Sequence, residues 1–153
     1  PSAYVFSALP AGKVAAVHRG TAVLKVLDIN TGKLLRSVVL GGEDVDRGRS
    51  MYGALPKPSQ SSNVSQPALV ISGASGPSGD MFLLIGPFTP SEGARVVRID
   101  ANGAVVSSLR CGYEGFKAED GPPQLVAVDD KELYLASRAG HVRVYPLTAM
   151  ATP

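Results

Sequence analysis

The chain has 153 residues, of which 44% are hydrophobic and 18% charged, and its formal net charge is +2. This is the composition of one globular domain with a core, and it excludes a chain that is disordered throughout. Arginine and lysine are spread along the chain without forming a run, which excludes the clustered basic stripe of nucleic-acid-binding proteins, so we expect no nucleic-acid partner.

Short β-rich runs, separated by turns that contain glycine or proline, predict an all-β chain without a long amphipathic helix. Four strands are expected first, at residues 3–8, 13–19, 22–29 and 33–40. A polar segment rich in Gly, Ser and Pro follows at residues 41–66, and we expect it to be a loop. Four more strands are expected at 68–72, 81–86, 94–100 and 104–109, and a last group of three at 125–128, 132–137 and 141–145.

Two of the expected hairpins share one turn chemistry. Asp28 is followed by Asn30, Thr31 and Gly32, and Asp100 is followed by Asn102 and Gly103. Glycine tolerates the positive φ of a tight strand connection, and an aspartate at a turn start accepts hydrogen bonds from turn amides. We therefore interpret both aspartates as turn residues, in preference to metal ligands.

Four-stranded meanders in tandem predict β-propeller blades, each of which buries its faces against its neighbours. The expected division of the single all-β region 1–153 is a blade at 1–40, an inserted loop at 41–66, a blade at 67–112 and a partial blade at 121–147. The strands are apolar on both faces, which suits blades covered on both sides. A β-sandwich of the immunoglobulin-like kind is the alternative, and it predicts two packed sheets.

The turn of Asp28, Thr31, Gly32 and Lys33 resembles the Asp-x-x-Thr-Gly-Lys turn of quinoprotein-like propeller repeats. The segments 132–137 and 140–145 are similar to the third and fourth elements of WD-repeat-like and quinoprotein-like blades. The resemblance implies a β-propeller repeat protein. By analogy with other propellers, it also allows an enzyme of the quinoprotein, lyase or hydrolase kind with its site at the propeller axis.

Three blades, the last of them incomplete, cannot close a propeller, because closed propellers have about 4–8 blades. We therefore expect this chain to be one part of a larger propeller, completed by other residues of the same gene product, by another chain or by a second copy. No apolar run approaches the ~20 residues that span a bilayer as a helix, and none reads as a signal peptide.

Candidate chemical sites all have a simpler structural interpretation. The acidic cluster of Glu43, Asp44 and Asp46 lacks the further ligands of a calcium loop, so we expect a solvated loop whose Asp and Arg residues pair. The glycine-rich segment 73–79 precedes a strand instead of a helix, which favours a hairpin connection over a phosphate-binding loop.

Catalytic side chains are scarce. The chain has only two histidines, His18 and His141, which fall on or beside expected strands, and no Gly-x-Ser-x-Gly motif. The single cysteine, Cys111, excludes an intrachain disulfide and is interpreted as a buried thiol at a strand end. We assign no catalytic residue, no metal ligand and no cofactor.

The leading hypothesis for function is a non-enzymatic propeller that serves as an interaction or scaffold module, with protein partners. The inserted segment supplies the expected contact residues, Arg47, Arg49, Met51 and Tyr52, because Arg, Tyr and Met are enriched at interface cores. The same segment holds Asn63, which matches the N-glycosylation pattern with Val64 and Ser65. The alternative hypothesis is the propeller enzyme with its site at the axis.

Overall fold

The computed structural model describes residues 3–55, 68–86, 93–111 and 121–152. Their strands form three antiparallel sheets, which we call blades 1, 2 and 3 in chain order. Blade 1 comprises β1 (Tyr4–Leu9), β2 (Lys13–His18), β3 (Val23–Asp28) and β4 (Leu34–Val39). Blade 2 comprises β5 (Val70–Ser75), β6 (Met81–Ile85), β7 (Ala94–Ile99) and β8 (Val105–Cys111). Blade 3 comprises β9 (Pro123–Val128), β10 (Glu132–Ser137) and β11 (Val142–Pro146).

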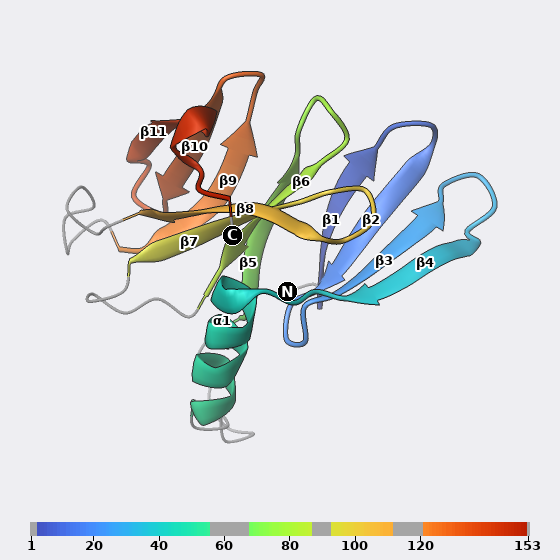
Figure 1. The fold of residues 1–153 in the computed structure, drawn as a ribbon, viewed down its shortest axis with the longest axis horizontal. Coiled ribbons are helices and arrows are strands. Elements are labelled where there is room, and N and C mark those ends of the chain that lie inside the picture. Colours follow the sequence, from blue (N-terminus) through green and yellow to red (C-terminus); the bar gives the residue numbers. More distant parts are fainter. Residues whose placement is uncertain (1–2, 56–67, 87–92, 112–120, 153) are drawn as a thin grey trace.

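The blades stand side by side like the ribs of a fan (Figure 1). Each is a meander in which consecutive strands pair, and the first strands of the three blades lie next to one another, β1 against β5 and β5 against β9. This is the arrangement of part of a β-propeller, with the first strand of each blade nearest the axis. The predicted fold is confirmed, and the alternative of two packed sheets is wrong because a middle sheet is covered on both faces.

Two separate hydrophobic clusters hold the blades together. The first lies between blades 1 and 2 and includes Val17, Leu24, Leu83 and Ile85. The second lies between blades 2 and 3 and includes Phe82, Leu84 and Leu133, among others. Successive residues of β6 therefore contribute to opposite clusters, as the alternation of side chains along a strand requires.

The turn aspartates act as the sequence predicts. The Asp28 carboxylate accepts hydrogen bonds from the amides of Asn30 and Thr31 at 3.0 and 2.9 Å, and Gly32 follows with a φ of +67°. In the second hairpin the Asp100 carboxylate accepts from the amides of Asn102 and Ala104, at 2.8 and 2.9 Å. Both hairpins are thus closed by hydrogen bonds from turn amides to an aspartate carboxylate.

The segment 41–66 differs from its prediction, because α1 (Glu43–Ala54) is a helix where we expected a loop. Its first turn carries Glu43, Asp44 and Asp46, whose negative charge is favourable at a helix N-terminus. Val45 and Gly48 are buried. The polar, glycine-containing sequence concealed a helix that is stabilised by contact with β6 and β7 of blade 2. The remainder of the expected loop, 56–66, lies outside the described residues.

The glycine-rich segment 73–79 is also partly corrected, since Gly73 and Ser75 belong to β5. A Cβ built on Gly73 would lie 2.9 Å from the Leu83 side chain and 3.0 Å from that of Val5. Glycine is needed there because the first strands of blades 1 and 2 approach closely, and only residues 76–80 form the turn.

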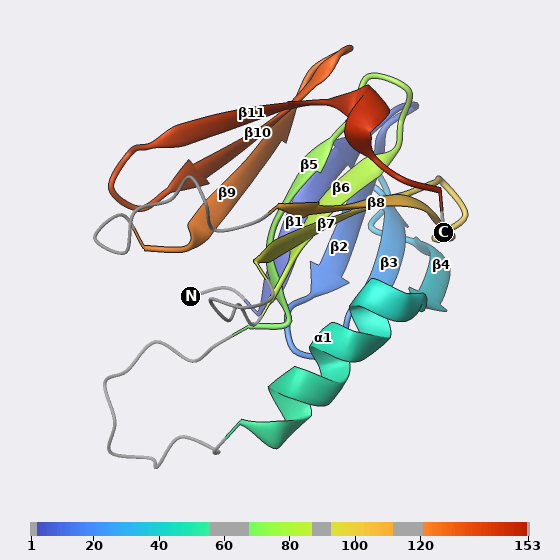
Figure 2. The ribbon, with the colours of Figure 1, turned by 60° about the vertical axis from the view of Figure 1, so that its left-hand side comes forward.

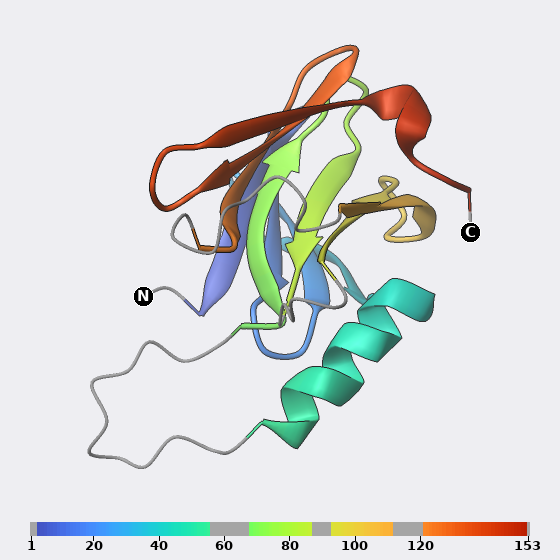
Figure 3. The same ribbon diagram turned by 90° about the vertical axis from the view of Figure 1, so that its left-hand side faces the viewer.

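After β11 the chain forms a short 3₁₀-helix, η2 (Leu147–Ala149), and returns toward blade 2 (Figure 2). There Ala151 pairs with Ser108 of β8, with both backbone hydrogen bonds at 2.8 Å. This return links the outer edge of blade 2 to the end of blade 3. In Figure 3 the link is seen from the side, with α1 on the other side of β8.

Candidate interaction surfaces

The expected contact residues of the inserted segment all lie on α1, but not all of them face solvent. Tyr52 packs against the cluster between blades 1 and 2, and Arg49 donates a hydrogen bond to the Leu40 carbonyl at 2.7 Å. Arg47 is exposed and Met51 half-buried. Two of the four thus serve the fold of this chain, and whether α1 binds a protein stays a prediction. Asn63 lies outside the described residues.

The acidic cluster lies on α1 and not in a loop. Asp46 is exposed and pairs with Arg49, as expected, whereas Asp44 attaches α1 to blade 2. The Asp44 carboxylate is buried and lies 3.4 Å from Nε of Arg95, whose side chain is 1% exposed. It also accepts a hydrogen bond from Nε of Arg110 at 3.0 Å, while Glu43 pairs with the same guanidinium at 3.0 Å. These carboxylates raise the pKa of Arg110, Asp44 most strongly. The cluster is an ion-pair anchor, which the sequence could not place without knowing what α1 packs against.

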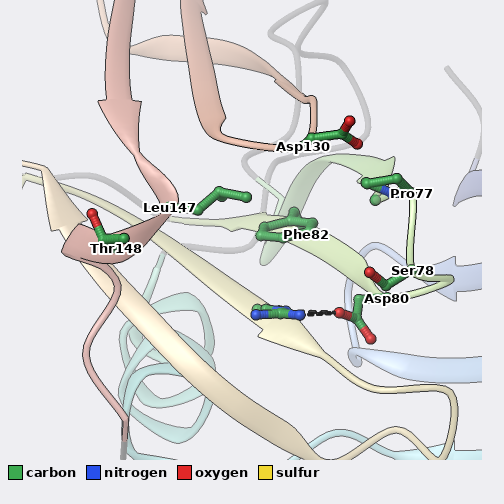
Figure 4. A pocket seen from close by; sticks show the side chains of 9 residues that line it. Pro77, Ser78, Asp80, Phe82, Asp130, Leu147 and Thr148 are labelled. Atoms are coloured by element: carbon green, nitrogen blue, oxygen red, sulfur yellow. Dashed lines mark hydrogen bonds and ion pairs between the residues drawn. The ribbon is translucent and has the colours of Figure 1, made fainter.

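A hollow of about 320 Å³ opens between blades 2 and 3 (Figure 4). Its walls come from the β5–β6 turn, from β6 and β7, from the β9–β10 turn and from η2. Among its lining residues, Arg98 donates to the Asp80 carboxylate from Nε at 2.8 Å. The Arg98 guanidinium lies 5.8 Å from the centre of the Phe82 ring. Asp130, Ser78 and Thr148 are its other polar residues.

The hollow offers recognition chemistry and little catalytic chemistry. Its carboxylate at Asp80 and its cation at Arg98 are paired with each other, and neither His18 nor His141 lines it. Within the residues that the structure describes, no group of three or more His, Cys, Asp and Glu could hold a metal ion. Among the described residues, the hollow is thus lined by one ion pair, one further carboxylate and two hydroxyls, without a histidine.

The strands nearest the propeller axis are poor in ionisable groups. Of the residues in β1, β5 and β9, only Tyr4 can titrate, and the rest are apolar, Ser, Gly, Pro or Gln. An enzyme with its site at the axis needs convergent ionisable side chains there. The described first strands provide one such residue, Tyr4, and no group of them.

Displaced pKa values mark structural positions. Hydrogen bonds from turn amides and neighbouring side chains lower the pKa of Asp28, Asp100 and Asp129, most strongly from Thr31, Ala104 and Tyr134 respectively. Burial raises the pKa of the Cys111 thiol to about 11, so this buried cysteine at the end of β8 is protonated at neutral pH. The sequence-based interpretation of Cys111 as a buried thiol at a strand end is confirmed.

Blade 1 has a large apolar face turned away from blade 2. Val5 and Val17 are opposite one another in the register and pack toward blade 2, so the alternate residues point the other way. We define the open face of blade 1 by Tyr4, Phe6, Lys25, Leu34 and Val39. Phe6, Leu34 and Val39 are 60%, 51% and 66% exposed, so the described residues leave this face uncovered.

Blade 3 has a matching face at the other end of the fan. Leu133 and Leu135 of β10 pack against blade 2, and the alternate positions point outward. We define the open face of blade 3 by Leu125, Glu132, Tyr134, Val142 and Val144. Its Leu125, Val142 and Val144 are 61%, 57% and 50% exposed. Contiguous exposed apolar surface of this kind usually marks an interaction site.

Sequence reasoning placed the contact residues on the inserted segment, and it also expected that three blades need something further to complete them. It did not identify which residues form the open faces. Strands such as β1 and β9 carry apolar residues at successive positions and not only at alternate ones. A strand of an exposed sheet would carry polar residues on its solvent side.

No protein-family model matches the chain, and no curated protein matches it. Among solved structures it is similar to a protein of unknown function from Bacteroides caccae, at 10% identity and a TM-score of 0.45, over 100% of this chain and 49% of that one. It is also similar to a streptogramin B lyase, at 14% identity and a TM-score of 0.36, over 94% of this chain and 54% of that one. The chain thus spans about half the length of these structures. No described helix is long and apolar enough to cross a membrane.

Proposed function

We propose that this chain is a non-enzymatic interaction module, a three-bladed segment of a propeller whose two open faces are covered by further blades in a larger assembly. The observation that carries the proposal is the pair of open faces. Phe6 and Val39 at one end and Leu125 and Val142 at the other are at least half exposed, although they stand in regular strands of apolar sequence.

The energetic argument concerns burial. Burying one large apolar side chain is favourable by about 1.5–3 kcal/mol, so a face with several of them strongly favours association with another protein surface. Inside the chain the equivalent faces of blade 2 are already covered, and each of its β6 residues is buried. A blade that follows blade 3 or precedes blade 1 would extend the same packing.

The enzymatic alternative is less well supported. Its site would lie at the axis, and Tyr4 is the one ionisable residue in the first strands described there. The hollow beside Phe82 lies between two blades, and its Asp80 and Arg98 neutralise each other. The module is therefore expected to bind through its faces.

Thiol labelling of the open faces tests the proposal. The replacements Val39→Cys and Val142→Cys place one reactive thiol on each face, and Ser50→Cys, at an exposed residue of α1 that lies on neither face, is the control. Cys111 adds little background, since it is buried and burial raises its pKa to about 11. In the native assembly we expect the two face thiols to react at least ~10-fold more slowly than the control thiol.

The same thiols should react as fast as the control when the isolated chain is highly dilute. If the face thiols and the Ser50→Cys thiol reacted equally fast in the native assembly, the open faces would be solvent-facing there. The proposed function would then be wrong.

A further inference from the structure

The two open faces correspond to opposite sides of a blade. Blade 1 presents to blade 2 the face that contains Val5 and Val17, and blade 2 presents to blade 3 the face that contains Phe82 and Leu84. Continuing this order, the open face of blade 3 is the one that a following blade would cover, and the open face of blade 1 is the one that a preceding blade would cover. The two faces are therefore suited to each other and not to themselves.

Their charges are also opposite. On the open face of blade 1, Lys25 lies with its Nζ 5.8 Å from the centre of the Tyr4 ring, and the strand residues of this face include no Asp or Glu. His18 is on the same face, paired in register with Tyr4.

On the open face of blade 3, the Tyr134 hydroxyl lies 2.8 Å from Glu132 Oε2 and 2.6 Å from Asp129 Oδ2. The strand residues of this face include no Lys or Arg, because Arg143 is in register with Leu135 on the side toward blade 2. A basic apolar face and an acidic apolar face thus stand at opposite ends of one chain (Figure 1).

We propose that the cover is a second copy of this chain, docked head to tail so that the open face of blade 3 in each copy lies on the open face of blade 1 in the other. This inference rests on the proposed function, which makes both faces interfaces. Two such contacts related by a two-fold axis close a ring of six blades, within the range of about 4–8 seen in closed propellers. The face that holds Lys25 in one copy then lies on the face that holds Glu132 in the other, at both interfaces.

Sedimentation equilibrium of the chain 1–153, with charge-reversal variants, tests this arrangement. We expect a reversible monomer–dimer equilibrium whose upper mass is twice 15.8 kDa. Lys25→Glu and Glu132→Lys should each weaken the dimer by about 10-fold or more, because each places like charges together at both interfaces. Lys33→Glu, an exposed reversal in the β3–β4 turn, is the matched control and should leave the equilibrium unchanged.

Mixing the two variants gives the sharpest result. A head-to-tail pair of one Lys25→Glu chain and one Glu132→Lys chain has opposite charges at both of its interfaces, so the mixture should regain the wild-type dissociation constant. Recovery also shows that each variant is folded.

Several results would overturn the second-copy proposal. A chain that stays monomeric at all concentrations excludes it, and so do variants that dimerise like the wild type. Failure of the mixture to recover would indicate contact between like faces, and open-ended oligomers would show that the ring does not close. A monomeric chain whose face thiols are nevertheless protected in the native assembly would overturn the second copy alone, whereas unprotected thiols would overturn the proposed function as well.

Discussion

The second strands of blades 2 and 3 hold the same place in their sheets but differ in burial. Every residue of β6, Met81–Ile85, is buried, whereas in β10 burial alternates from Leu133 to Ser137. The difference comes from neighbours, because blade 2 has a blade on each side and blade 3 has one. In this architecture the next blade decides whether an apolar strand is buried.

Truncation of the β6 leucines should show this difference at its largest. Leu83→Ala and Leu84→Ala open cavities in the two separate clusters, and each should lower the free energy of unfolding by about 2–5 kcal/mol. Leu125→Ala on the open face of blade 3 should change it by about 0.5 kcal/mol or less in dilute solution. Urea denaturation measures all three, and an equal loss for Leu125→Ala would mean that this face is already covered.

The attachment of α1 to blade 2 allows a comparison within one helix turn. Asp44→Ala removes the carboxylate between Arg95 and Arg110 and leaves a buried guanidinium, so we expect a loss of about 3 kcal/mol. Asp46→Ala breaks only the exposed pair with Arg49 and should cost about 0–1 kcal/mol. Similar unfolding free energies for the two variants would contradict the role of Asp44 as an anchor.

Two glycines of α1 provide a second matched pair. A Cβ at Gly48 would lie 2.8 Å from the Gly86 carbonyl oxygen and 2.8 Å from the Ile85 side chain, so Gly48→Ala should cost about 1–3 kcal/mol. Apart from the neighbouring backbone of α1, no atom of the described residues lies within 4 Å of a Cβ at Gly53, so Gly53→Ala should stabilise the helix by about 0.5–1 kcal/mol. Thermal denaturation would refute the close packing of α1 if both changes were stabilising.

The smallest expected effect is the contribution of the two hairpin aspartates, Asp28 and Asp100, to the pH dependence of stability. The pKa of Asp28 in the folded chain is below the ordinary 3.8, so its contribution to stability is full well above pH 3.8 and is lost as pH falls through the folded-state pKa. Asp100 behaves alike. The double variant Asp28→Asn, Asp100→Asn should therefore lose less stability than the wild type between pH 5 and pH 2 in urea titrations. An unchanged acid dependence would contradict the turn hydrogen bonds.

The sequence predicted the strands and turns well because their signals are local. Asp28 with Gly32, and Asp100 with Gly103, mark hairpins by turn chemistry that needs no tertiary context. The meander order and the incomplete third blade follow from the spacing of those turns.

Features that depend on contact between distant segments were not predictable. The helix α1 has a polar, glycine-containing sequence and is held by Asp44 against Arg95, more than 50 residues away along the chain. Gly73 reads as a loop residue until the approach of Val5 and Leu83 is known. The open faces were implied by apolar residues at successive strand positions, but which faces lack a cover depends on how the blades are ordered.

Binding of a hydrophobic fluorescent dye across a dilution series of the isolated chain tests the central claim most directly. The account predicts strong fluorescence per chain at low concentration, where the faces around Phe6 and Val142 are open, and a fall as the concentration rises and the faces cover each other. Phe6→Asp combined with Val142→Asp should stop the faces from covering each other, so dye binding per chain should no longer fall as the concentration rises. A wild-type chain that binds no dye at any concentration, while remaining a monomer that melts cooperatively, would contradict the account.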